Sequence, residues 1–309
     1  MVGTTVTVAE KRMERVEVEA ANKIIGQKFP VLDHGFVVLV DYMGSDSSIV
    51  QAARTSYGQG TKSVRDDAGL IRYLMRHRHT TPFEMVELKF FIGAPMSEWR
   101  QHIRHRTASV NEYSSRYSEV KDVVYIPALE DIATQSKSNR QGRGERLPIE
   151  EAEAIRNEMD QHAKVAYALY RKLLEAGVAR ETARGVLPLD TYTEAYWKID
   201  LWNLFHFLGL RLDSHAQLEI RAYANRMHEI ARVVAPVACE AFDDFVINSI
   251  ALTKKERVAV RAMLRSDVAA EDACSSAGLQ LVKEDGTPFK TGEGPEFIEK
   301  LARIRASVI

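Results

Sequence analysis

The sequence contains few of the residues that build disulfide-linked or metal-dependent proteins. Its 309 residues include two cysteines, Cys239 and Cys274, which cannot form a disulfide framework and lack the paired spacing of zinc ligands. We therefore expect a reducing, cytoplasmic setting. The sequence has no HExxH pair, and the histidines between 77 and 105 lie among arginines, which disfavour a bound cation. We expect no metal site.

Long apolar runs and an excess of one charge are also absent. No run of about 18 apolar residues occurs, and the N-terminal segment lacks the apolar core of a signal peptide. The 42 Lys and Arg residues balance 43 Asp and Glu residues, so the formal net charge is -1. A dedicated nucleic-acid binder normally carries a strong basic field. We expect a soluble protein with no membrane or nucleic-acid partner.

Two glycine-rich phosphate-binding motifs are missing as well. Neither GxGxxG between a strand and a helix nor GxxxxGK[ST] is present, so the sequence predicts neither a dinucleotide-binding fold nor a P-loop. Any phosphate site must therefore be built from other donors.

Positive charge is instead concentrated in the stretch 101–117, which reads QHIRHRTASVNEYSSRY. Its basic, acidic and hydroxyl side chains are Arg104, His105, Arg106, Glu112, Ser114, Ser115 and Arg116. Arginine binds phosphate oxygens bidentately, and hydroxyl and backbone N–H groups can complete such a site. A solvated basic surface is the alternative, but apolar flanks and irregular spacing disfavour it. The stretch predicts an anionic-ligand site.

Hydrophobic periodicity predicts short elements in the first half of the chain. The expected elements are strands over 36–44 and 85–92 and helices over 46–57, 66–78 and 95–106, with a loop from 107. We expect Asp46 or Ser47 to cap the first of these helices. On the helix that follows Pro95, we expect a stripe of Met96, Trp99 and Ile103 to pack inward.

Longer helices are predicted in the second half. The expected elements are a mobile loop over 129–148, helices over 150–176, 201–211 and 215–245, a short helix within 179–188, and a strand over 191–199. Gly177 is expected to end one helix and Asp200 to cap another. Arg184, Asp200, His206 and Arg211 are polar residues in apolar surroundings, which is costly without partners. They are further candidate site residues.

No cysteine or serine predicts nucleophilic catalysis convincingly. Cys239 lies in an apolar stripe typical of a core residue, and Cys274 lies in a loop near the C-terminus. Ser114 has no assured base beside it, so we interpret it as a phosphate donor. The pattern indicates a protein that binds a phosphorylated substrate and a cofactor, and leaves the covalent chemistry to the cofactor.

One motif resembles a known family. RHRTASVNEYSSR, at 104–116, is similar to the RHRxxSxNExSxR signature of flavin-dependent thymidylate synthases at every fixed position. HTTPFE at 79–84, ARGVLP at 183–188 and LRLDSHAQLEIRAYA from 210 extend the resemblance, which covers about 36–245. It implies an α+β fold, with an antiparallel or mixed sheet flanked by helices, and a homotetramer with sites at subunit interfaces.

The resemblance also implies the organisation and the activity. We expect an N-terminal extension over 1–30, the family domain over 31–248, and a helical C-terminal extension over 249–309. In this extension, Thr253 and Glu256 predict a capping box, followed by a loop and a last helix over 295–304. The implied reaction methylates dUMP to dTMP, with methylenetetrahydrofolate as carbon donor, NADPH as reductant, FAD as cofactor and no cysteine nucleophile.

Site residues carry over at the matching positions. The dUMP-binding set would be Gln101, His102, Arg104, Glu112, Ser114, Ser115, Arg116, Arg184 and Arg211. The FAD-binding set would be His79, Thr81, Arg104, His105, Arg106, Glu112, Asp200, Trp202 and His206. Arg211 would be catalytic, because it would favour ionisation of uracil at N3. Asp200 and Trp202 depart from the Asn-Ala-Arg found in some members.

Two alternative functions stay open at this point. Arg104, Arg106 and Arg116, with Tyr113 and Tyr117 as stacking groups, could bind RNA. The family scaffold could also act on another nucleotide.

Overall fold

The computed structural model describes residues 15–55, 67–137, 142–265, 269–283, 285–289 and 293–306. The chain divides into two compact units. One comprises Met1–Thr134 and Glu145–Ile247, and the other comprises Gln135–Gly144 and Asn248–Ile309. Within the described residues, no helix is long and apolar enough to cross a membrane.

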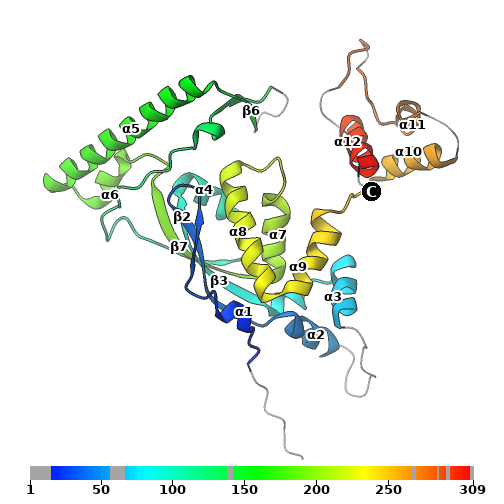
Figure 1. Ribbon diagram of the computed structural model, residues 1–309, viewed down its shortest axis with the longest axis horizontal. Helices are drawn as coiled ribbons and strands as arrows, with labels where there is room; N and C mark the ends of the chain where they lie inside the picture. Colours follow the sequence, from blue (N-terminus) through cyan, green and yellow to red (C-terminus); the bar gives the residue numbers. More distant parts are fainter. Residues whose placement is uncertain are drawn as a thin grey trace, which may run out of the picture. The chain divides into compact units, whose positions relative to one another are not determined.

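A five-stranded antiparallel sheet forms the centre of the first unit (Figure 1). Its strands, in spatial order, are β1 (Lys28–Val31), β2 (Gly35–Met43), β3 (Glu87–Pro95), β7 (Tyr192–Asp200) and β4 (Ser109–Glu112). The strands expected over 36–44, 85–92 and 191–199 are confirmed. β4 lies where a loop was expected, because its four residues are all exposed and carry no apolar alternation.

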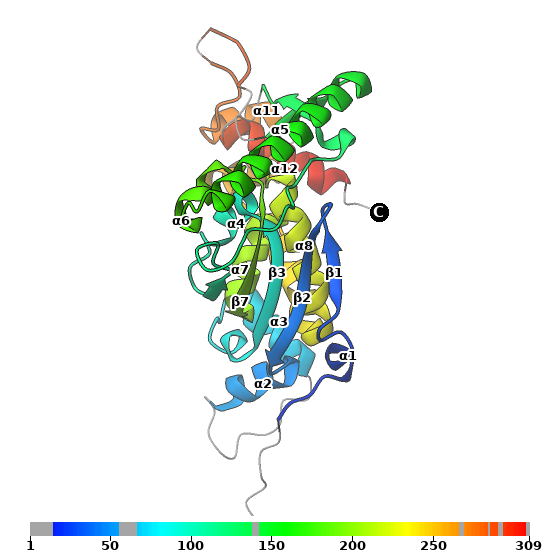
Figure 2. The ribbon, with the colours of Figure 1, turned by 90° about the vertical axis from the view of Figure 1, so that its left-hand side faces the viewer.

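Helices cover one face of this sheet (Figure 2). Alternate residues of a strand point to opposite faces, and Leu88, Phe90 and Ile92 of β3 are buried in the core. The helices α7 (Leu201–Arg211) and α8 (Leu218–Val234) contribute to the same core. A Cβ atom on Gly35 would lie 2.0 Å from the hydroxyl of Tyr223 on α8, so glycine permits this close approach.

The remaining helices of the first unit are shorter, apart from one. They are α1 (Glu19–Asn22), α2 (Asp46–Thr55), α3 (Asp67–Arg76), α4 (Met96–His102), α5 (Ile149–Glu175), α6 (Arg180–Ala183) and α9 (Pro236–Phe242), with 3-10 turns at Phe83–Met85, Leu129–Asp131 and Arg184–Val186 and a π turn at Asp243–Ile247. The helices expected over 66–78, 150–176 and 201–211 are confirmed. Gly177 follows α5 with a φ of 78°, in the left-handed region that favours glycine.

The single helix expected over 215–245 is two helices. α8 ends at Val234 and α9 begins at Pro236, because proline has no N–H and its ring clashes with a preceding helical turn. The carboxylate of Asp46 accepts hydrogen bonds from the backbone N–H groups of Val237 and Ala238, both at 2.9 Å. Asp46 therefore caps α9 and not the helix that it begins.

Residues 129–148 and the C-terminal part contain more regular structure than expected. The strands β5 (Ala133–Gln135) and β6 (Arg143–Arg146) form a two-stranded sheet within the predicted loop. The second unit contains α10 (Lys254–Arg265), α11 (Ala270–Ser276) and α12 (Glu293–Ala306), and α11 lies where a loop was expected. The capping box is confirmed, since Glu256 N–H donates to Thr253 Oγ1 at 3.4 Å and Thr253 N–H donates to Glu256 Oε2 at 2.5 Å.

Candidate active site

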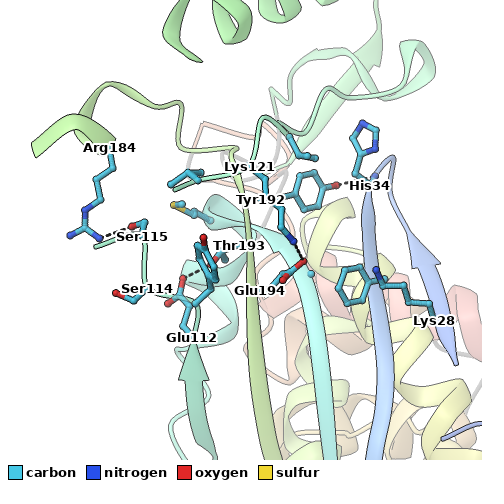
Figure 3. A pocket seen from close by; sticks show the side chains of 16 residues that line it. Lys28, His34, Glu112, Ser114, Ser115, Lys121, Arg184, Tyr192, Thr193 and Glu194 are labelled. Atoms are coloured by element: carbon cyan, nitrogen blue, oxygen red, sulfur yellow. Dashed lines mark hydrogen bonds and ion pairs between the residues drawn. The ribbon is translucent and has the colours of Figure 1, made fainter. Parts of the chain in front are cut away.

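A cavity of about 520 Å³, the first cavity, lies where β7 begins and β3 ends (Figure 3). Four of the predicted nucleotide-binding residues line it: Glu112, Ser114, Ser115 and Arg184. Arg184 Nη1 donates a hydrogen bond to Ser115 Oγ at 2.7 Å. The structure thus brings a guanidinium and two hydroxyl groups from separate segments to one space, which is the donor set that a phosphate group needs.

Several other residues of the first cavity were not predicted. Tyr192 and Thr193 lie at the start of β7, and Lys121 pairs with Glu194 at 2.8 Å between Nζ and Oε1. The alternation that predicts β7 also accounts for its tyrosine and threonine as ordinary strand residues. Their position in the cavity therefore left no separate signal in the sequence.

A second cavity of about 300 Å³ gathers positive charge. Its lining is Arg104, His105, Arg106, Thr107, Ile199, Asn203, His206, Leu210 and Arg211. Five of these residues were predicted from the sequence, and no lining residue in this described part of the chain is an aspartate or glutamate. The arginine and amide donors suit an anionic ligand.

Within the second cavity, His105 and Arg211 contact each other directly. Arg211 Nε donates to His105 Nε2 at 3.1 Å. Burial lowers the pKa of His105 to about 4, and electrostatic interactions with Arg211, His102 and His206 add to this effect. A neutral imidazole can accept the hydrogen bond. The bond engages Nε of Arg211 and leaves its two terminal nitrogens for a ligand.

The predicted nucleotide-binding set is divided between these two cavities. Glu112 belongs to the first, whereas Arg104 and Arg211 belong to the second. β4 ends at Glu112 in the first cavity, whereas Thr107, five residues earlier, lines the second, a span of about 16 Å at 3.3 Å per residue. A single chain therefore carries its predicted nucleotide-binding residues in two separate groups.

His102 lies in neither cavity, and its predicted contact with the nucleotide disagrees with its position. The side chain is 0% exposed, and its Nδ1 lies 2.8 Å from Oε1 of the equally buried Glu98. The two residues lie one turn apart on α4 and pair through these two atoms, whereas Glu98 Oε2 and His102 Nε2 are buried without a hydrogen-bond partner. The buried face of α4 therefore consists of Glu98, Trp99 and His102. The expected inward position of Ile103 is wrong, because its side chain is 41% exposed.

Two further predicted nucleotide-binding residues lie outside the cavity linings. Gln101 Nε2 donates to Gln217 Oε1 at 2.6 Å. Arg116 is exposed and forms an ion pair with Glu181, with 3.3 Å between Nη2 and Oε2. Both are oriented by these protein partners.

The other predicted cofactor-binding residues also lie outside the second cavity. Asp200 caps α7, as expected, because its carboxylate accepts from the backbone N–H of Asn203 at 2.9 Å and from its side-chain amide at 2.7 Å. Trp202 is half-buried against the core. His79 and Thr81 are exposed.

Cys239 is unsuited to nucleophilic attack. It is 0% exposed, and burial raises the pKa of its thiol, with the negative charges at Asp243 and Asp46 adding to the shift. The described residues contain no group of three His, Cys, Asp or Glu side chains that could hold a metal ion.

Sequence comparison identifies the family. A family model described as "Thymidylate synthase complementing protein" matches residues 38–237. The flavin-dependent thymidylate synthase of Ehrlichia ruminantium (strain Gardel) is 50% identical over 267 residues, covering 86% of this chain and 90% of that protein. This chain belongs to the flavin-dependent thymidylate synthase family. The predicted family is confirmed, and membership makes the chain a methyltransferase.

Other members and a solved structure agree with this assignment. A flavin-dependent thymidylate synthase of Thermus thermophilus is 55% identical over 250 residues, covering 81% of this chain and 90% of that protein. The crystal structure of a UMP/dUMP methylase, PolB from Streptomyces cacaoi, bound with 5-Br UMP, has a TM-score of 0.64 and 36% identity, covering 70% of this chain and 96% of that one. The predicted α+β fold class is confirmed.

Proposed function

We propose that this thymidylate synthase methylates dUMP to dTMP, with methylenetetrahydrofolate as carbon donor and NADPH as reductant. The observation that carries the proposal is the first cavity, where Arg184 and Ser115 are already hydrogen-bonded beside Ser114 and Glu112. Arg184, Ser114 and Ser115 would hold the phosphate through charge-assisted hydrogen bonds. The negative Glu112 would instead accept a hydrogen bond from an O–H or N–H group of the nucleotide.

The residues of the second cavity fit FAD. Arg104, Arg106 and Asn203 would donate to its pyrophosphate, because they supply positive charge and N–H groups without an acidic neighbour in the lining. Asp200 does not line this cavity, and both of its carboxylate oxygens accept hydrogen bonds from Asn203. When bound, FAD passes reducing equivalents from NADPH to the transferred carbon. His79 and Thr81 would contact the cofactor from outside the cavity.

Arg211 is the proposed catalytic residue. Its guanidinium would stabilise negative charge that develops on the uracil when N3 ionises, and the ionised ring is electron-rich at C5. His105 would hold the guanidinium in position through Nε2. This route needs no enzyme thiolate.

We propose that the complete site forms between subunits of a homotetramer. Glu112 and Arg211, which would act on one nucleotide, lie in different cavities of the same chain. Association of two subunits would bring the first cavity of one chain to the second cavity of its neighbour. This division supports the expected tetramer.

Activity and product analysis test the function. We expect the purified protein to show a flavin absorption band and to oxidise NADPH faster when dUMP and methylenetetrahydrofolate are present, giving dTMP by mass spectrometry. A preparation without flavin and without dUMP-stimulated oxidation would contradict the proposal. UMP is assayed in parallel, because the similar solved structure is described as a UMP/dUMP methylase. Methylation of UMP in preference to dUMP would overturn the substrate assignment.

A variant pair tests the phosphate contact. Arg184→Gln removes the guanidinium from the first cavity and should raise KM for dUMP at least tenfold, since charge-assisted hydrogen bonds contribute about 1.5–3 kcal/mol. Arg180→Gln is the matched control, because Arg180 is also exposed on the same short segment but does not line the cavity. Equal effects of both substitutions would contradict the assignment.

A further inference from the structure

The carboxylate of Glu112 is held by two side chains from separate elements. Thr193 Oγ1 donates to Oε1 at 2.9 Å, and Trp99 Nε1 donates to Oε2 at 3.2 Å. Thr193 is 5% exposed and Trp99 is 3% exposed, whereas Glu112 is exposed at the first cavity. Figure 3 shows Glu112 directed toward Thr193 from the neighbouring strand.

The backbone fixes the relative positions of these residues. Glu112 of β4 lies opposite Ala195 of β7, and Tyr113 N–H extends the pairing by donating to Glu194 O at 2.8 Å. Thr193 is two residues from Ala195 on β7, so it lies on the same face of the sheet and diagonal to Glu112.

Trp99 is itself held rigidly. Its ring stacks on the buried His102, with 5.2 Å between ring centroids and 20° between ring planes. His102 is in turn bonded to Glu98. The indole N–H therefore has a fixed direction toward Glu112.

We propose that Thr193 and Trp99 are positioning residues, which orient the Glu112 carboxylate toward a hydrogen-bond donor of the nucleotide. A carboxylate has about four lone-pair directions, of which Thr193 and Trp99 engage two. The others remain for a hydroxyl or N–H group in the first cavity. The inference rests on the proposed nucleotide-binding function of this cavity.

Removal of either donor tests the proposal in the holoenzyme. Thr193→Val keeps the side-chain size and removes the hydroxyl. It should raise KM for dUMP about fivefold to tenfold, because a carboxylate held only by Trp99 has more freedom to lose when the nucleotide binds. KM for NADPH and for methylenetetrahydrofolate should be unchanged. Thr193→Ser should restore the wild-type KM, and Trp99→Phe, which removes the other donor, should act like Thr193→Val.

Thr191→Val is the matched control. Thr191 is 1% exposed and immediately precedes β7, and its hydroxyl donates to Pro188 O at 2.7 Å without contacting Glu112. The same substitution at this position should change KM for dUMP by less than about twofold. If Thr193→Val and Trp99→Phe both behave like this control while Glu112→Gln raises KM, the positioning role is wrong.

A double-mutant cycle separates this inference from the function on which it rests. If Thr193 acts through Glu112, Thr193→Val should have no further effect in a Glu112→Gln background. Additive effects would overturn the inference. If Glu112→Gln alone leaves KM for dUMP unchanged, the assignment of Glu112 to the nucleotide site is wrong, and the positioning role is wrong with it.

The nucleotide donor can be identified in the same assay. With an analogue of dUMP that lacks the 3′-hydroxyl group, the effect of Thr193→Val should vanish if Glu112 accepts from the sugar. It should persist if Glu112 accepts from the base. If Thr193→Val leaves KM unchanged for both dUMP and this analogue, the proposal is wrong.

Discussion

His105 acts on Arg211 through one hydrogen bond whose direction depends on the protonation of the imidazole. Arg211 Nε is a donor, so His105 Nε2 must be unprotonated to accept. Burial, and electrostatic interactions with Arg211, His102 and His206, lower the pKa of His105 to about 4. The neutral form therefore predominates at any pH well above 4, including the range near 6.5 where an unperturbed histidine would become charged.

We predict that two substitutions of His105, one with and one without a hydrogen-bond acceptor, have different effects on turnover. His105→Gln retains a carbonyl acceptor and should preserve more turnover than His105→Leu, for which we expect kcat to fall about tenfold, the cost of about one lost hydrogen bond to a charged group. The wild-type pH profile of kcat should show no loss from this residue as pH falls from about 8 to about 5.5. If the wild-type pH profile of kcat has an inflection at about pH 6.5 and His105→Gln abolishes it, the assigned protonation state is wrong.

Cys239 provides a second prediction for a single residue. Cys239→Ala should keep appreciable turnover, because the thiol is fully buried and burial raises its pKa. The measurement is kcat at saturating dUMP, with flavin content and circular dichroism as controls for folding. Complete loss of turnover in a folded, flavin-loaded variant would favour a thiol mechanism.

Among the elements, α9 depends on a cap supplied from far away in the sequence. The first N–H groups of a helix have no partner within the helix, and Asp46 accepts from two of them at Val237 and Ala238. Burial raises the pKa of Asp46, although these two bonds lower it. Burial therefore disfavours the charged carboxylate, and the two N–H groups of α9 compensate part of this cost.

We predict that Asp46→Ala lowers the free energy of unfolding by about 1–2 kcal/mol, the usual cost of a lost cap. Asp46→Asn retains one side-chain oxygen acceptor and should cost less. Urea unfolding monitored by circular dichroism measures both. Equal losses for alanine and asparagine would show that the hydrogen bonds from α9 are not the main contribution of this residue.

For the whole molecule, the C-terminal helices have a core separate from that of the enzyme domain. Ala259, Ala273, Cys274, Leu279 and Phe297 form one buried cluster, which includes no residue of the large sheet-centred cluster. All residues that line the two cavities belong to the first unit. The catalytic machinery proposed above is thus contained in the residues before 248.

We predict that removal of residues 249–309 leaves flavin binding intact and changes dUMP-dependent NADPH oxidation by less than about twofold. Absorbance spectra and steady-state kinetics of the shortened chain measure this. If the shortened chain still binds flavin but its NADPH oxidation no longer depends on dUMP, the C-terminal helices contribute to the substrate site.

The sequence by itself determined the family and much of the local structure. The 104–116 motif is contiguous, so its residue identities are readable without a fold. β2, β3 and β7 follow from apolar runs or alternation, and α5 and α7 from helical spacing, because these patterns arise from the strand and helix periods themselves.

The tertiary structure alone decided how the candidate site is arranged. Pairing with β7 makes β4 a strand, and pairing with Glu98 buries His102 in the core. Tertiary contacts likewise place Arg184 beside Ser115 and direct Asp46 to α9. In most of these cases the partner is distant in the chain, and a local period contains no information about such contacts. For the same reason, the division of the predicted nucleotide-binding residues between two cavities became visible only in three dimensions.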